Sequence, residues 1–359
     1  MGFFNKIFKE KDTTIKTNDD FWNWFVQNEK RFFNVVQNRG DVEKEFFNEL
    51  SPKLAELKDG YFFLTGMIDE QTADLILTAD GLISNIVFVE ELVAAAPKID
   101  GWRFTALKPA VDIENFNVKM EDYEFKKENL SFKYHQDPDF PDEINLTIVH
   151  DDYNDENADI INRGTYIFLD NYLGELNFTT TIDTLSVTGK NDAIEDLIPI
   201  EKLKAFLAWR EKEFIEKYEG TRHDTENDRY DMLEATLKNG KPLLAIVNKE
   251  LLKWDSKASH PWIVCIEVKY TANENGLPNE QDYQLLNNLE DDIMRSLKDS
   301  DGYLNIGRET AEGLREIYFA CKDFRKISKV LYEIKRTTSF ELTYDIYKDK
   351  YWRSFDRYI

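Results

Sequence analysis

Two arginines in the C-terminal third of the chain, Arg308 and Arg315, form its most distinctive chemical pair. The strands predicted around them are joined by a loop at 310–313, which would place the two side chains directly opposite each other, at the rim of the helix-covered sheet face. Like charges opposed across a hairpin destabilise it, so a negative group should lie between them. A local carboxylate, Glu290 or Asp291, is the favoured partner, and a carboxylate or phosphate of a bound ligand is the alternative.

Three further candidate binding residues lie on the opposite face of the same predicted sheet. Strand alternation places Tyr303, Glu316 and Tyr318 there. RNA-recognition sheets combine stacking aromatic residues with basic ones, whereas acids on this face outnumber the single Lys269. We therefore expect a protein-binding surface that does not bind RNA. The alternative is that the face packs against the rest of the same polypeptide, as surfaces between domains commonly do.

Residue types that catalyse reactions or bind metals do not gather in the sequence. His135 and His150 should lie about 20 Å apart on paired strands, too far to share a metal ion. Cys265 lies five residues from His260, about 16 Å along an extended strand, and His223 falls in a polar linker. The sequence contains neither a Gly-x-Ser-x-Gly motif nor a phosphate-binding loop. We therefore predict no catalytic residue, no metal ligand and no cofactor.

The net charge of the chain limits the kinds of partner that it can bind. Its 359 residues carry 69 Asp and Glu against 46 Lys and Arg, a net charge of −23, and no basic run offsets this field, so we expect no nucleic-acid binding. The functional interpretation of the charge is a basic protein partner, and the alternative is that it only prevents aggregation. No apolar run approaches the ~20 residues of a membrane span, and the opening residues do not predict a signal peptide. The two cysteines are too few for a disulfide framework, so we expect a cytoplasmic protein. Because it has no such apolar run, we also expect that it does not enter a membrane.

The last third of the chain has a clear pattern of elements. After residue 262, alternating and helical spacings predict a strand, a helix, two strands, a helix and a strand. This is the ferredoxin-like order, in which two βαβ crossovers form one antiparallel sheet. A β-hairpin precedes it, because Asn239-Gly240 suits a type I′ turn. The predicted hairpin strands are 232–238 and 241–248, the later strands are 262–270, 303–309, 314–320 and 340–346, and the helices are 278–297 and 323–334.

The first half of the chain predicts a different arrangement, and the fold class of the whole is α+β. Two amphipathic helices joined around Asn38-Arg39-Gly40 should form a hairpin. Two strand-strand-helix-strand units follow, and they could share one continuous mixed sheet. The units are 61–67, 73–78, 86–96 and 102–107, then 130–135, 144–149, 158–173 and 176–186.

Breaks in these patterns define the predicted domains. Residues 1–17 are expected to be a flexible tail, and residues 18–190 an N-terminal α+β domain with the helix hairpin and the mixed sheet. Residues 191–222 should form a bridging helix and a polar linker. Residues 223–359 should form the ferredoxin-like domain, with the β-hairpin ahead of it.

Several short motifs in the C-terminal part carry a resemblance to a known family. They are His260-Pro261-Trp262, Gly276-Leu277-Pro278, Asn288-Leu289-Glu290-Asp291, Gly307-Arg308-Glu309-Thr310, Gly313-Leu314-Arg315-Glu316-Ile317-Tyr318-Phe319 and Tyr351-Trp352. With these motifs, residues 230–359 resemble a bacterial family known only as domain of unknown function 695. The hairpin around Arg308 and Arg315 is also similar, more faintly, to the ferredoxin-like protein inhibitor of endoribonuclease E, which implies action by binding an enzyme rather than by catalysis. Residues 101–104 and 169–175 resemble segments of uncharacterised bacterial proteins without a known activity.

These observations favour a non-enzymatic protein-interaction or regulatory module of the cytoplasm. The alternative is an enzyme, such as a hydrolase, with its site in the cleft between the two halves of the chain. A polar pocket there with a strongly perturbed acid or histidine would favour the enzyme, and an exposed apolar patch would favour the interaction module.

Overall fold

The computed structural model describes residues 14–190 and 196–359. Most of the predicted tail, residues 1–13, and the start of the predicted linker lie outside the described residues. The chain is α+β and divides into two compact units, Met1–Pro109 and Ala110–Ile359. This division falls inside the predicted domain 18–190. The boundaries near 190 and 222, as limits of independently folding parts, stay predictions. In the described part of the chain, no helix is both long and apolar enough to cross a membrane.

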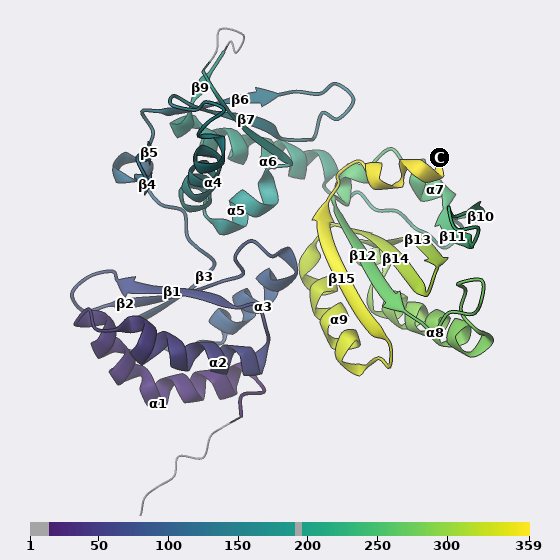
Figure 1. Cartoon of the computed structure of the whole chain (residues 1–359), viewed down its shortest axis with the longest axis horizontal. Coiled ribbons are helices and arrows are strands. Elements are labelled where there is room, and N and C mark those ends of the chain that lie inside the picture. Colours follow the sequence, from purple (N-terminus) through teal and green to yellow (C-terminus); the bar gives the residue numbers. More distant parts are fainter. Residues whose placement is uncertain (1–13, 191–195) are drawn as a thin grey trace, which may run out of the picture. The chain divides into compact units, whose positions relative to one another are not determined.

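The first unit packs a helix hairpin against a three-stranded sheet (Figure 1). Thr17 caps the first helix and exchanges hydrogen bonds with Asp20 in a capping box. The core of the unit is aromatic, and the rings of Phe32 and Phe46 stack 4.3 Å apart. The helices are α1 (Asn18–Gln37), a π-helical turn (Glu43–Phe47), α2 (Asn48–Leu57) and α3 (Ile83–Ala94), and the strands β1 (Phe62–Met67), β2 (Ala73–Thr78) and β3 (Trp102–Ala106) pair in the order β1-β2-β3.

The second strand-strand-helix-strand unit opens the second compact unit and has a sheet of its own, so the expectation of one continuous sheet is wrong. In the part of the chain that the structure describes, β1, β2 and β3 form one sheet and the strands of the second unit form others. A second correction concerns residues 176–186, predicted as a strand. Glu175–Thr181 instead form a helix, which Gly174 at φ 80° separates from the preceding helix, and the strand begins only at Thr184. The elements are β4 (Val118–Met120), β5 (Tyr123–Phe125), β6 (Leu130–His135), β7 (Asn145–His150), α4 (Ala158–Leu173), α5 (Glu175–Thr181), β8 (Thr184–Gly189), β9 (Ile198–Pro199) and α6 (Leu203–Tyr218), with the sheet order β8-β7-β6-β9.

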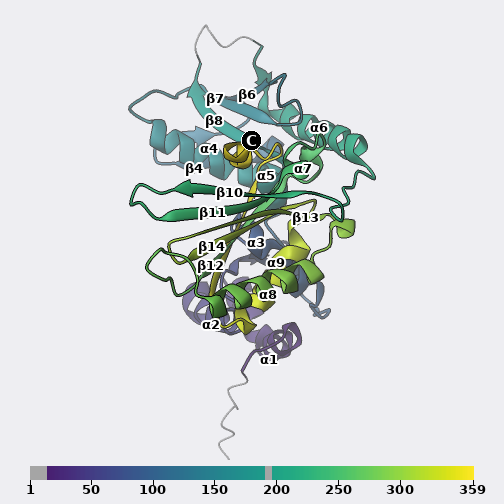
Figure 2. The same cartoon turned by 90° about the vertical axis from the view of Figure 1, so that its right-hand side faces the viewer.

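The C-terminal sheet has six strands in the order β10-β11-β13-β14-β12-β15, and every neighbouring pair is antiparallel. The predicted sequence of strand, helix, strand, strand, helix and strand is present. Figures 1 and 2 show α8 and α9 on one face of the sheet. The elements are β10 (Tyr230–Thr236), β11 (Pro242–Asn248), α7 (Lys249–Leu252), β12 (Trp262–Lys269), α8 (Glu280–Ser296), β13 (Tyr303–Ala311), β14 (Leu314–Cys321), α9 (Phe324–Thr337), β15 (Glu341–Lys348) and the C-terminal 3-10 helix η6 (Arg353–Tyr358).

Two hairpins differ from the predicted turns. At the first, Gly240 has a positive φ and Asn239 does not, and Leu237 bonds to Lys241, so the type I′ prediction is wrong. At the second, Ala311 pairs with Leu314, which leaves a two-residue turn in place of the predicted four. Both residues of that turn, Glu312 and Gly313, have positive φ, as a type I′ turn requires.

A β-bulge between Asn305 and Gly307 reverses the alternation of β13. Gly307 lies at φ 143°, and a Cβ there would come within 2.2 Å of the Ile246 carbonyl oxygen, so only glycine fits this close approach of two strands. Residues before the bulge therefore lie on the face opposite to the one predicted. Leu304 belongs to the core away from α8 and α9, beside Tyr318.

Candidate functional site

The arginine pair is buried among partners from its own sheet and helix. Because the turn is short, Arg315 pairs with Thr310 and Arg308 with Ile317, so the prediction that the arginines lie directly opposite each other is wrong. The favoured local bridge is present, since Arg308 Nη1 lies 2.5 Å from a carboxylate oxygen of Glu290. The two arginines do share the helix-covered face, as predicted.

Arg315 lies deeper than predicted, at 1% exposure rather than at the rim. Its partners are neutral: its Nε donates to the Thr310 hydroxyl at 3.1 Å, and its Nη1 donates to the Asn287 side-chain oxygen at 2.9 Å. The Tyr283 ring lies 5.6 Å from the guanidinium carbon. Burial, with Arg308 nearby, lowers the pKa of Arg315 to about 10. The guanidinium is therefore held by side chains of its own sheet and of α8.

Tyr303 lies on the helix-covered face, so its predicted place beside Glu316 and Tyr318 is wrong, because of the bulge in β13. The ammonium of Lys326, from α9, lies 5.3 Å from its ring centroid. Burial raises the pKa of the Tyr303 hydroxyl. Tyr303 therefore belongs to the packing of α9 on the sheet and not to a surface shared with the other candidates.

Glu316 and Tyr318 lie on the predicted face, and η6 covers part of it. The Tyr318 ring packs edge-on against Phe355 at 5.2 Å, and Trp352 and Tyr358 belong to the same core. The end of the chain therefore covers this half of the face, and packing of the whole face against the rest of the polypeptide stays a prediction.

The uncovered half of that face holds the one group of described residues placed to bind a metal, namely Cys265, Glu267 and Glu316. Their ligand atoms lie within 4.8 Å of one another. Burial and the nearby Glu316 raise the pKa of the Cys265 thiol to about 12, so the thiol keeps its proton at neutral pH. Burial and Glu309 also raise the pKa of Glu316. A protonated thiol is a weak ligand and a weak nucleophile, so we assign Cys265 no metal and no catalytic role.

The edge strand β10 presents apolar side chains to solvent. Met232 is 71% exposed and Tyr230 is 41% exposed. Hydrogen bonds from Lys249 to Arg229 and from Leu237 to Lys241 fix the register with β11. In an antiparallel ladder the hydrogen-bonded pairs alternate, so the main-chain groups of the even-numbered residues face away from β11. Strand β10 is therefore an open edge with apolar side chains beside it.

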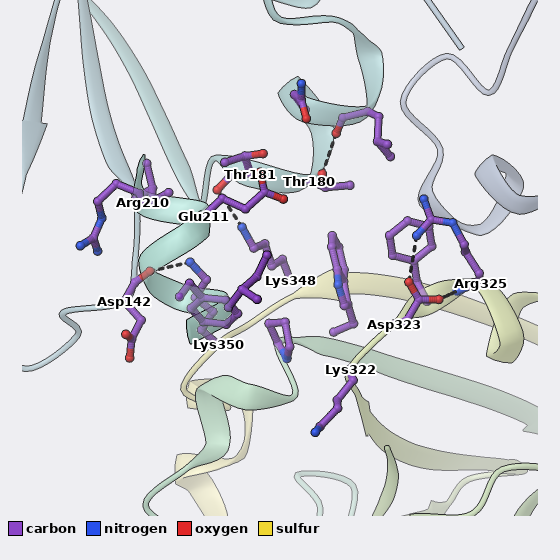
Figure 3. A pocket seen from close by; sticks show the side chains of 18 residues that line it. Asp142, Thr180, Thr181, Arg210, Glu211, Lys322, Asp323, Arg325, Lys348 and Lys350 are labelled. Atoms are coloured by element: carbon purple, nitrogen blue, oxygen red, sulfur yellow. Dashed lines mark hydrogen bonds and ion pairs between the residues drawn. The ribbon is translucent and has the colours of Figure 1, made fainter. Parts of the chain in front are cut away.

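A cavity of about 320 Å³ lies within the second compact unit, where α5, α6, α9 and the end of β15 meet (Figure 3). Lys348, the last residue of β15, donates to the Thr181 carbonyl at 2.9 Å and lies 2.9 Å from Asp183. Lys350 also bonds to Asp183, at 2.7 Å, and to the Asp142 carbonyl at 2.5 Å. Two buried lysines thus share one carboxylate.

The acidic residues at this cavity are already bound to their own partners. The Asp142 carboxylate accepts from Lys217 at 2.7 Å, from Tyr218 at 2.7 Å and from Tyr351 at 2.6 Å. Although burial alone would raise the pKa of Asp142, these bonds hold it below its usual range. Burial, partly opposed by Asp183, lowers the pKa of Lys348 to about 8. Both an acid and a lysine at this cavity therefore have shifted pKa values, and the shift of Asp142 favours the charged carboxylate, whereas that of Lys348 favours the neutral amine.

Sequence reasoning missed this cluster because its members come from distant segments. Asp142 and Tyr351 are 209 residues apart, and Asp183 and Lys350 are 167 apart. The one local signal was Lys348-Asp349-Lys350, two lysines spaced to reach one side of an extended segment.

Comparison with known proteins identifies the C-terminal part of the chain. Residues 232–359 match a family of unknown function, DUF695. The match covers the six-stranded sheet almost from its first strand, and it confirms the resemblance of this stretch. The fainter likeness to the inhibitor of endoribonuclease E is not found. No curated protein and no solved structure matches the chain.

Proposed function

We propose that this protein is a non-enzymatic interaction module of the cytoplasm, which binds an extended, basic segment of a partner protein along the open edge of β10. The observation that carries the proposal is the combination, on one edge strand, of outward-facing main-chain groups and exposed Tyr230 and Met232. An added strand would gain main-chain hydrogen bonds for affinity, and the apolar side chains would select the residues placed beside them.

The other edge of the sheet serves this purpose less well. The exposed side chains of strand β15 are Glu341, Thr343 and Asp345, so this edge offers an added strand no exposed apolar side chain to contact. On β10, by contrast, Met232 is 71% exposed. An exposed apolar edge is a liability unless something covers it, which favours a binding role for β10.

Charge complementarity favours a basic partner. Strand β10 carries Asp231 and Glu234 and no basic residue, and the whole chain has a net charge of −23. A second copy of this chain would bring the same negative charges to the edge and would be repelled. A lysine- or arginine-rich strand would be attracted, and its rate of encounter would fall with added salt. The free state of Cys265 and Cys321 fits a reducing compartment.

The test uses proline at an outward-facing position of β10. Glu234→Pro removes an N–H that faces away from β11, so it should leave the sheet intact but remove one docking donor and block the edge. Glu234→Ala is the matched control, because it changes the side chain and keeps the N–H. We expect the proline variant to weaken partner binding at least tenfold and the alanine variant to weaken it less than threefold.

Binding is read out by a photo-crosslinking residue placed at Met232 in the full chain, in lysate of the source cell. The crosslink should map to a basic segment of the partner and should vanish in the Glu234→Pro background. The same crosslinker at Thr343, on the opposite edge, is the control position. Equal crosslinking at both positions, or persistence in the proline variant, would contradict the proposal.

A further inference from the structure

We propose that the cavity beside Lys348 binds a small organic anion, with a phosphate or carboxylate as its charged group and a flat apolar body. The site is separate from the edge of β10, and nothing in its argument depends on the function proposed above. Its volume of about 320 Å³ lies within the usual range of small-molecule sites.

The lining of the cavity reverses the charge balance of the chain. Acids outnumber bases in the chain as a whole, 69 to 46, whereas five bases and three acids line the cavity. The bases are Arg210, Lys322, Arg325, Lys348 and Lys350, and the acids are Asp142, Glu211 and Asp323. A positive cavity in a negative protein attracts anions selectively.

The positive charge of the two lysines is only partly neutralised by the carboxylate beside them. Among the described residues, Asp183 is the carboxylate that bridges Lys348 and Lys350, and all three side chains are less than 15% exposed. Asp142 is held by Lys217 and two tyrosines, so it offers little further compensation. Burying a net charge is unfavourable, and an anion entering the cavity would supply the missing negative charge.

A second cationic group reaches the cavity from another element. Arg325 lies in the first turn of α9, 2.8 Å from Asp323, and Figure 3 shows it among the lining residues, on a different element from Lys348. The first turn of a 14-residue helix carries partial positive charge from its N–H groups. An anion at this end of the cavity would meet this guanidinium and the helix dipole, beside the Asp323 carboxylate that caps the helix and accepts from the Arg325 N–H at 2.7 Å.

The wall between these cations is apolar and aromatic. Trp262 and Phe324 meet edge to face at 5.0 Å, and Phe214 and Ile215 of α6 also line the cavity. A polar ion alone, such as inorganic phosphate, would leave these surfaces uncovered. A ligand that joins an anionic group to a flat ring uses both features, which sets the proposed chemical class.

The experiment titrates the full chain with four probes: phenyl phosphate, benzoate, inorganic phosphate and phenol. By calorimetry, at least one of the two aromatic anions should bind at least tenfold more tightly than inorganic phosphate, and phenol should not bind measurably. The tighter of the two anions identifies the preferred charged group. Failure of both to bind, or binding of phenol with similar affinity, would overturn the proposal.

Two further measurements place the probe. The tighter anion should protect Lys348 and Lys350 from acetylation at least threefold, measured by peptide mass spectrometry of the wild-type chain. Arg325→Gln should weaken binding at least fivefold, whereas Lys326→Gln should not, because Lys326 pairs with Asp301 away from the cavity. No protection of Lys348, or equal effects of the two substitutions, would place the anion elsewhere and refute the proposal.

Discussion

Two pairs of basic side chains lie in the second compact unit, and they differ in how their charge is balanced. Arg308 has a carboxylate of its own, Glu290, and Arg315 is held by neutral oxygens in closely packed surroundings. Lys348 and Lys350 share Asp183 at the wall of a cavity. The difference suggests that a buried cation with packed neutral partners is structural, while cations that share too little negative charge beside open space mark a binding site.

The largest expected effect comes from removing the shared carboxylate. Asp183→Ala leaves two buried lysines without their anion, and breaking a buried pair in this way costs about 3–5 kcal/mol of unfolding free energy at pH 7. Glu290→Ala should cost less, because Arg308 is 19% exposed and can reach water. Chemical denaturation of both variants makes the comparison, and a larger loss for Glu290→Ala would reverse the assignment of the two pairs.

Arg315 provides the next largest effect and tests whether the first pair is structural. Arg315→Ala removes a fully buried side chain and leaves Asn287 without a donor, so we expect a loss of about 2–4 kcal/mol. Arg315→Met keeps most of the volume and removes a buried charge, and it should cost less than about 1.5 kcal/mol. Denaturant melts measure both losses. Equal losses would mean that the charge, and not the packing, is what this position needs.

The arginine pair also shows how much of the candidate site could be predicted from the sequence. Strand alternation correctly predicted that both arginines lie on the helix-covered face. Glu290, one of the two carboxylates predicted as a local partner, does bind Arg308. The register could not be predicted, since it depends on Glu312 adopting a positive φ, which is unusual for a glutamate. The bulge at Gly307, which displaced Tyr303, leaves no sequence signal beyond one glycine within a strand.

The lysine pair could not be predicted from the sequence, for a different reason. Its anion and its hydrogen-bond acceptors come from segments more than 160 residues away, so no local spacing encodes it. The element order of the C-terminal sheet was predictable because each element has its own periodicity. The two separate sheets in the first half could not be predicted for the same reason as the lysine pair. Pairing between distant strands does not depend on the local sequence pattern.

The dependence of the unfolding free energy on pH should distinguish the lysine pair from the arginine pair. Lys348 has a pKa of about 8 in the folded chain against an ordinary value of 10.5, so between these values the unfolded chain binds more protons. The penalty for burying the charged lysine is therefore full below pH 8 and disappears as the pH rises towards 10.5. Relative to Lys348→Met, the wild-type chain should gain about 2–3 kcal/mol over this window. Relative to Arg315→Met, the wild-type chain should gain less, about 1 kcal/mol, because the pKa of Arg315 is about 10 against an ordinary value of 12.5, so most of its titration lies above pH 10.

The smallest effect is expected for an exposed ion pair on the same sheet, which serves as a reference for the two buried pairs. Lys269 and Glu341 lie 2.6 Å apart across β12 and β15, but their side chains are 61% and 65% exposed. Water and salt screen such a pair, so Lys269→Met should change the unfolding free energy by less than about 1 kcal/mol. The measurement is a denaturant melt at low and at high salt, and the small loss should shrink further at high salt. A loss as large as that of Asp183→Ala would show that ion-pair geometry alone, and not burial, sets these energies. The contrast between the arginine and lysine pairs would then lose its physical basis.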